Sequence, residues 1–205
     1  MAFTGFTEKD FEVFAVEGLE PRMQALIATV RPKLEALGEM FAPMLTAMTG
    51  EDVYAHVAKH ARRTVHPPDN TWVAFSSDKR GYKKHPHFQI GLWRTHVFVW
   101  FAVLDEAANK AAYARALAER EAEIRAIIPP SFVWSTDHTR PETVNRLDAE
   151  MIERLGKVKK AELLCGVTIP REEAVRRTDL IEIFEQTFTA LAPLYQWTTR
   201  AAVLL

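Results

Sequence analysis

Apolar residues recur at helical spacing through the first quarter of the chain. They follow this spacing over residues 23–30, and a second stripe of the same spacing runs over residues 34–48. Thr7 is suited to cap a short helix that comes before these two stripes. Gly50 is suited to end the helix of the second stripe. The pattern therefore predicts a helical N-terminal part over about residues 7–50.

Short aromatic and β-branched runs fill the middle of the chain, over residues 72–76, 88–93 and 96–104. The third run is apolar at both parities, because aromatic residues alternate with valines along it. A strand without a polar face is covered on both sides, so we expect this run at the centre of a sheet. The connection at residues 94–95 is too short for a parallel crossover, so the strands that flank it should pair antiparallel.

Helices and strands alternate in the second half of the chain. The pattern predicts a helix over about 106–127, a strand over 132–134, a helix opening at Pro141, a strand over 161–168 and a last helix that Pro193 ends. The order of elements indicates an α+β fold, a mainly antiparallel sheet with helices packed on it in two layers. We expect a single domain over residues 1–205, with its sheet core at about 70–168 and its C-terminal helix at about 171–192.

Composition excludes several classes of protein. The chain has 205 residues, of which 48% are hydrophobic and 26% charged, as in an ordinary globular domain. Its single cysteine, Cys165, excludes internal disulfides and four-cysteine zinc sites. No apolar run is long enough to span a membrane, and the first residues lack the basic and apolar regions of a signal peptide. We therefore expect a cytoplasmic protein without a membrane partner.

Positive charge is concentrated in one segment, although the formal net charge of the whole chain is only −1. Residues 59–87 hold seven lysines and arginines against two aspartates, so this segment is +5 and the rest of the chain is −6. Its densest part is the predicted turn Asp78–Lys84. Cations crowded on a turn repel one another and gain from an anion that bridges them; the alternative is a solvated hairpin tip whose charge blocks edge pairing.

A second basic group precedes this turn at residues 59–63. If residues 56–63 were helical, His56, Lys59, His60 and Arg63 would share one face, which could meet the turn and form one cleft with it. Two separate solvated surfaces are the alternative. The candidate ligand-binding residues are His60, Arg62, Arg63, Lys79, Arg80, Tyr82, Lys83 and His87. His60 and His87 are the candidate proton donors.

Metal binding is a weaker interpretation of the histidines. His56 and His60 have i,i+4 spacing, and His85 and His87 share one face of a strand, but lysines flank both pairs. We predict no metal and no cofactor. The pair Asp137 and His138 has the chemistry of an acid–base pair, and a position on the surface explains it equally well. Catalytic residues, and whether the protein is an enzyme, stay unknown.

Several long strings of this sequence resemble a known family. They are His60–Arg63, Trp72–Phe75, Lys79–Lys84, Pro86–Trp93, Thr95–Phe101 and Lys159–Gly166. Together they resemble the YktB-like family of uncharacterised bacterial proteins from Bacillus-type organisms, over about residues 6–195. The resemblance implies an α+β fold loosely similar to the biotin-ligase and class II synthetase type of sheet. It implies no activity, because the family has none established.

Three hypotheses about function follow from these observations. The first is that a small anionic ligand, a nucleotide or an acyl carboxylate, binds in a basic cleft that contains histidine. The second is that RNA or single-stranded nucleic acid binds across a broad basic face, with affinity that falls steeply with salt. The third is a protein-interaction module without a pocket.

Overall fold

A computed structural model describes residues 3–203 of the chain. Within that range the helices are α1 (Glu8–Glu12), the 3₁₀ helix η1 (Val13–Ala15), α2 (Leu19–Thr29), α3 (Arg31–Thr49), α4 (Lys110–Ala118), α5 (Glu121–Ile127), α6 (Ala149–Lys157), α7 (Arg171–Arg176) and α8 (Leu180–Val203). The strands are β1 (Tyr54–Val57), β2 (Asn70–Ser76), β3 (His87–Trp93), β4 (His96–Val103), β5 (Val133–Ser135) and β6 (Leu163–Pro170).

The six strands form one open sheet in the order β1-β2-β3-β4-β6-β5. Every neighbouring pair is antiparallel. The predicted α+β fold with a mainly antiparallel sheet is therefore confirmed. The run that is apolar at both parities is β4, and it lies between β3 and β6 as predicted for a strand covered on both sides.

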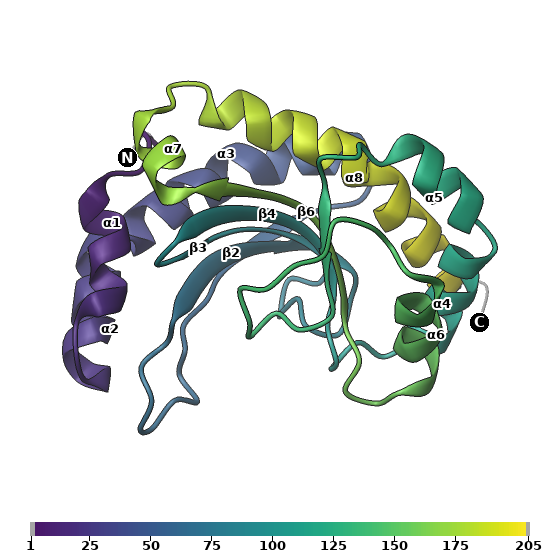
Figure 1. Cartoon of the computed structure of the whole chain (residues 1–205), viewed down its shortest axis with the longest axis horizontal. Coiled ribbons are helices and arrows are strands. Elements are labelled where there is room, and N and C mark those ends of the chain that lie inside the picture. Colours follow the sequence, from purple (N-terminus) through teal and green to yellow (C-terminus); the bar gives the residue numbers. More distant parts are fainter. Residues whose placement is uncertain (1–2, 204–205) are drawn as a thin grey trace.

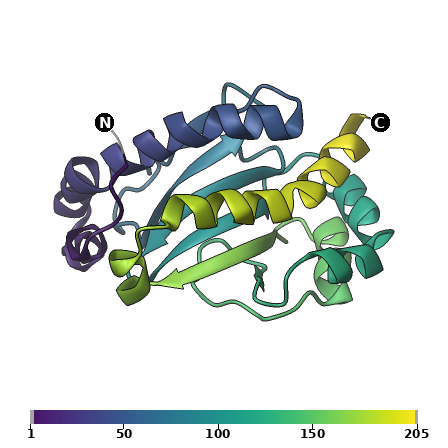
Figure 2. The same ribbon diagram turned by 90° about the horizontal axis from the view of Figure 1, so that it is seen from above.

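Helices α3 and α8 lie side by side across one face of the sheet (Figure 2). This face collects one parity of every central strand, and its side chains are valine, isoleucine, leucine, phenylalanine and cysteine. Phe41 of α3 and Phe188 of α8 lie 6.4 and 5.8 Å from Phe75 of β2, and 5.5 Å from each other, between ring centroids. These contacts make the main hydrophobic core, and Cys165 lies fully buried within it.

The opposite face of the sheet has no helix laid across it. Figure 1 shows the sheet as an arch, with α3 and α8 above it and connecting segments below. Helices α1, α2 and α7 gather at one end of the arch, and α4, α5 and α6 gather at the other. The face below the arch is therefore the one that can carry a site.

The N-terminal helical part ends where the sequence predicted. Thr7 donates its backbone N–H to Asp10 Oδ2 at 2.6 Å at the start of α1. Gly50 has φ of 76°, a left-handed angle that favours glycine, and it follows α3 directly. The helices α1, η1, α2 and α3 occupy this part of the chain, from Glu8 to Thr49.

The helix considered over residues 56–63 does not form, so that interpretation is wrong. Residues 54–57 form the edge strand β1, which pairs with β2, and residues 58–69 are an irregular loop. His60 has φ of 51°, which no α-helix accommodates. The sheet core therefore starts at Tyr54 and ends at Pro170, rather than at about 70 and 168.

Two predicted helices in the second half of the chain differ from the observed ones. The helix expected over 106–127 is divided into α4 and α5, which bury Leu117 and Ile124 separately. The helix expected at Pro141 begins at Ala149, because Asp148 caps it by accepting the backbone N–H of Glu150.

The C-terminal helix does not end before Pro193. Residues 171–176 form the short α7, and α8 continues through Pro193 to Val203. Proline removes one backbone donor from a helix. Burial of Phe188, Leu191 and Leu194 against the sheet compensates for that loss.

The single-domain organisation stays a prediction. Met1, Ala2, Leu204 and Leu205 of the predicted range 1–205 lie outside the described residues. None of the helices within residues 3–203 is both long enough and apolar enough to cross a lipid bilayer.

Candidate functional site

The face of the sheet turned away from α3 and α8 has a distinct composition. Its residues are small, aromatic or polar: Asn70, Trp72, Ala74, His87, Gln89, Gly91, Trp93, His96, Phe98, Trp100, Ala102, Leu164 and Gly166. A Cβ on Gly91 would lie 2.3 Å from Phe98 Cζ, so only glycine lets that ring lie across β3. The small residues therefore leave room for a layer of aromatic rings on the strands.

Two loops over this face carry the positive charge found in the sequence. Arg62 Nη1 of the first loop lies 3.7 Å from Glu106 Oε1, and Lys83 Nζ of the second donates to the same oxygen at 2.9 Å. Glu106 lies three residues after the end of β4. The two basic segments, separated by about twenty residues in the sequence, therefore meet at one carboxylate.

A cleft of about 450 Å³ opens between these loops. We call it the basic cleft, and it is lined by Arg62, Asp78, Arg80, Gly81, Tyr82, Lys83, Lys84 and Glu106. Four of these side chains are cationic and two are carboxylates, so the lining has a net charge of +2.

Both carboxylates of the basic cleft are held in the charged form. The hydrogen bond and charge of Lys83 lower the pKa of Glu106. The backbone N–H of Arg80 donates to Asp78 Oδ1 at 2.8 Å and lowers the pKa of that carboxyl. The two anions therefore stay ionised at neutral pH, and the four cations still exceed them.

The candidate cations do not all face the basic cleft. Arg62, Arg80 and Lys83 line it, together with Tyr82. Arg63 points elsewhere, because its Nη1 donates to the carbonyl oxygens of His66 and Pro67, both at 3.2 Å. Lys79 is exposed and is not among the lining residues.

His60 and His87 are unsuited to the predicted role of proton donor. Burial lowers the pKa of His60 to about 4, and its Nε2 lies 3.2 Å from Thr71 Oγ1. Burial also lowers the pKa of His87 to about 3. His87 Nδ1 donates to the carbonyl of His85, and Nε2 accepts from Gln89 Nε2, both at 2.8 Å. Both imidazoles are therefore neutral at physiological pH and already hydrogen-bonded.

Tyr82 separates the basic cleft from the aromatic layer on the sheet. Its ring lies edge-on to Trp72 at 6.4 Å and to His87 at 5.0 Å, while the side chain also lines the cleft. Burial raises the pKa of Tyr82 to about 12, so the phenol keeps its proton.

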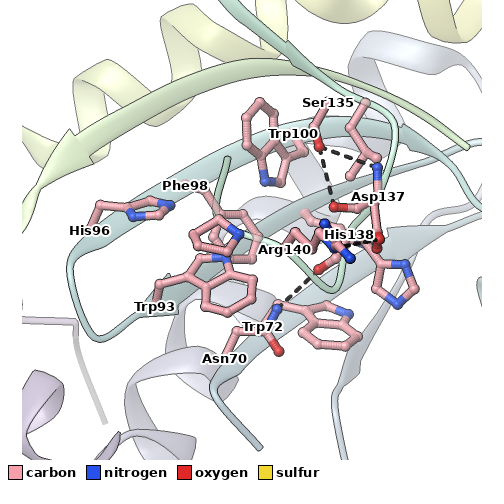
Figure 3. A pocket seen from close by; sticks show the side chains of 13 residues that line it. Asn70, Trp72, Trp93, His96, Phe98, Trp100, Ser135, Asp137, His138 and Arg140 are labelled. Carbon is pink, nitrogen blue, oxygen red and sulfur yellow. Dashed lines mark hydrogen bonds and ion pairs between the residues drawn. The ribbon is translucent and has the colours of Figure 1, made fainter. Parts of the chain in front are cut away.

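A second, nearly closed cavity lies on the other side of Trp72. We call it the aromatic pocket; Trp72, Trp93, Phe98 and Trp100 are its large apolar residues, and Asn70, Gln89, His138 and Arg140 are among its polar ones (Figure 3). Its volume is about 10 Å³, which is room for about one water molecule. The indole Nε1 of Trp72 is buried, with no hydrogen-bond partner among residues 3–203.

His138 and Glu162 form the most constrained polar pair in this region. His138 Nδ1 lies 2.8 Å from both oxygens of Glu162, and the backbone N–H of His138 donates to Glu162 Oε2 at 2.8 Å. The backbone N–H of Asp105 donates to the same carboxylate at 3.2 Å. Asn70 Nδ2 donates to the His138 carbonyl at 3.2 Å. The position of the imidazole is therefore fixed from both β2 and β6.

Sequence reasoning found only part of this pair. His138 was noted beside Asp137, whereas its partner is Glu162, which lies 24 residues later and just before β6. Together with Asp137 these two residues could hold a metal ion. However, Asp137 Oδ1 already accepts from both the N–H and the hydroxyl of Thr139, at 2.8 and 2.6 Å. The hydrogen bond from His138 Nδ1 to Glu162 orients the imidazole.

Comparison with known proteins places the chain in a family. The model of a domain of unknown function, DUF1054, matches residues 6–195. The chain belongs to the DUF1054 family. Among its relatives, the DUF1054 chain is 48% identical to a UPF0637 protein of Bacillus licheniformis, over 99% of the chain and 100% of that protein. It is 50% identical to a UPF0637 protein of Bacillus mycoides, over 95% and 98% respectively. Membership of an uncharacterised bacterial family, predicted from the sequence strings, is confirmed.

Proposed function

We propose that this protein binds a small anionic ligand, a nucleotide or an acyl carboxylate, in the basic cleft. The observation that carries the proposal is the convergence of Arg62, Arg80, Lys83 and Lys84 around one cavity in which two carboxylates leave a charge of +2. Convergent cations around a concave surface attract an anion more strongly than the same charges spread over a flat surface.

The two arginines are available to a ligand. Their side chains are 87% and 93% exposed for Arg62 and Arg80, so neither is committed to the interior. Their ion pairs with Glu106 and Asp78 are long, at 3.7 and 4.0 Å. A planar guanidinium can bind a phosphate or carboxylate through two hydrogen bonds, which is a better geometry than these ion pairs provide.

Binding of single-stranded nucleic acid is less well supported. That mode of binding needs aromatic faces exposed beside the cations. The aromatic side chain of the basic turn is Tyr82, and its ring packs against Trp72 and His87 instead. The cleft also argues against an interaction module without a pocket.

Pairs of neighbouring cations provide a matched test. Arg62→Ala and Arg63→Ala each remove one positive charge, but only Arg62 lines the cleft; Arg80→Ala and Lys79→Ala form a second such pair. Isothermal titration with pyrophosphate, ATP and succinate at constant ionic strength would measure the affinities. We expect Arg62→Ala and Arg80→Ala to weaken binding about five-fold or more, which corresponds to roughly 1 kcal/mol. Arg63→Ala and Lys79→Ala should change it less than about two-fold.

Three results would contradict the proposal. Absence of binding by every anion in the wild-type protein would remove it. Equal losses in all four variants would indicate long-range attraction rather than a site. Binding of an oligonucleotide, with steep salt dependence and no response to the small anions, would favour the nucleic-acid hypothesis.

A further inference from the structure

Trp72, one of the residues that line the aromatic pocket, carries a buried hydrogen-bond donor. Trp72 is 7% exposed, and its Nε1–H has no hydrogen-bond partner among the described residues. The Tyr82 ring lies edge-on to the Trp72 ring at 6.4 Å, but no hydrogen bond joins its phenol to Nε1. A buried N–H without a partner is costly, so a group that accepts from it would bind favourably here.

An acceptor with a free nitrogen lies beside this donor. The imidazole of His138 and the indole of Trp72 are adjacent and perpendicular, with centroids 6.1 Å apart (Figure 3). Because Nδ1 donates to Glu162, the tautomer that this contact selects has its lone pair on Nε2. Glu162 is 5% exposed, so the carboxylate that fixes this tautomer is itself held in place.

Trp72 and His138 both line a cavity with room for about one water molecule. A hydroxyl group can accept a hydrogen bond from Trp72 Nε1 and donate its own proton to His138 Nε2 at the same time. A carboxylate or a fully ionised phosphate cannot do so, because it has no proton to donate. The arrangement therefore distinguishes a hydroxyl from an anionic oxygen.

This pair of groups is next to the basic cleft. Tyr82 lines the cleft and lies edge-on to Trp72. The turn after β4 also links the two places, because Asp105 donates to Glu162 while the neighbouring Glu106 pairs with Lys83. The Tyr82 ring therefore lies between the basic cleft and Trp72.

We propose that Trp72 and His138 bind a hydroxyl group of the anionic ligand, so that the ligand is a small phosphate ester with free hydroxyls, such as a sugar phosphate. This inference rests on the proposed function, since the basic cleft must bind the phosphate. It adds the second contact point and the chemical class of the ligand.

Two probes separate this inference from the proposed function. Inorganic phosphate tests the basic cleft alone, and ribose 5-phosphate tests the cleft together with the hydroxyl site. We expect the full chain to bind ribose 5-phosphate at least about five-fold more tightly than phosphate in isothermal titration. Trp72→Phe keeps an aromatic ring and removes the N–H. His138→Asn keeps an N–H for Glu162 and removes Nε2. Each should abolish the preference and leave phosphate binding unchanged.

NMR of the tryptophan indole N–H groups gives a second readout, recorded on the wild-type protein. The indole N–H resonance of Trp72, identified by its loss in Trp72→Phe, should shift on addition of ribose 5-phosphate and stay in place with phosphate. Trp93→Phe is the control, because Trp93 lines the same pocket but stacks on His96. It should retain the preference.

Each remaining outcome overturns the inference. Equal affinities for the two probes, or a Trp72 resonance that ribose 5-phosphate does not move, would leave the anion site without a hydroxyl site. Loss of phosphate binding in Trp72→Phe would show that Trp72 supports the fold rather than the ligand. Failure of both probes to bind would refute the proposed function as well.

Discussion

His87 should make the protein sensitive to acid in a way that one substitution can measure. Its imidazole is fully buried in β3, and burial lowers its pKa to about 3. The unfolded chain should have a histidine pKa near its ordinary value of 6.5. At a pH between these two pKa values, His87 is protonated in the unfolded state but not in the folded state. The free energy of unfolding therefore decreases as the pH falls below about 6.5.

The magnitude follows from the two pKa values. Going from pH 7 to pH 4.5 protonates the unfolded imidazole almost completely and the folded one hardly at all. At about 1.4 kcal/mol for each pH unit, this single residue should cost about 2.5 kcal/mol of stability over that interval. His60 and His96, whose pKa values burial lowers to about 4, act in the same direction.

Urea denaturation at the two pH values, monitored by tryptophan fluorescence, would measure this cost. His87→Asn keeps a donor for the His85 carbonyl but does not titrate. It should be less stable than wild type at pH 7, because Gln89 loses its acceptor, yet it should lose about 2.5 kcal/mol less on acidification. His66→Asn, at an exposed loop position, is the control and should follow wild type. An equal acid loss in wild type and His87→Asn would refute the reasoning.

Three further predictions concern the sheet, the N-terminal helices and the cleft. Gly166→Ala should cost more than about 3 kcal/mol in chemical denaturation, because its Cβ would lie 1.8 Å from Val99 O; an unchanged midpoint would contradict the strand packing. Lys33→Met should cost about 3–5 kcal/mol by the same assay, because Asp10 is fully buried and loses the ammonium group 2.5 Å away; a loss below about 1 kcal/mol would argue against a buried pair. Glu106→Gln should strengthen pyrophosphate binding about five-fold in calorimetry by freeing two cations; weaker binding would show that Glu106 organises the cleft instead.

The sequence predicted the central strands of the sheet better than the edge strand β1 and the end of the last helix. The runs 96–104 and 161–168 were predicted as strands because both are continuously apolar, as expected for a strand that is buried on both faces. Strand β1 was missed because it is a four-residue edge strand with one exposed and three partly exposed residues, which leaves no hydrophobic period to detect. The prediction that the last helix ends at Pro193 was wrong, because the local preference of proline does not include the packing energy of a long buried helix.

Site residues were predictable as a charge cluster but not individually. Arg62 and Arg63 are indistinguishable in the sequence, and only the turn geometry sends one into the cleft and the other toward loop carbonyls. The pairing of His138 with Glu162 depends on a contact between a loop and the start of β6, so no local pattern could reveal it. The charge of the cleft follows from composition, whereas the tautomer of its neighbouring histidine follows only from three-dimensional contact.

The position of β6 in the sheet has a consequence for synthesis of the chain. This strand inserts between β4 and β5, and the helix α8 that closes the core follows it. While the polypeptide emerges from the ribosome, β4 can pair only with β3. Its other edge and its apolar side chains stay uncovered until residues 163–203 have been synthesised. A nascent chain interrupted before residue 163 would therefore expose an aggregation-prone edge, and such an intermediate is a natural client for chaperones.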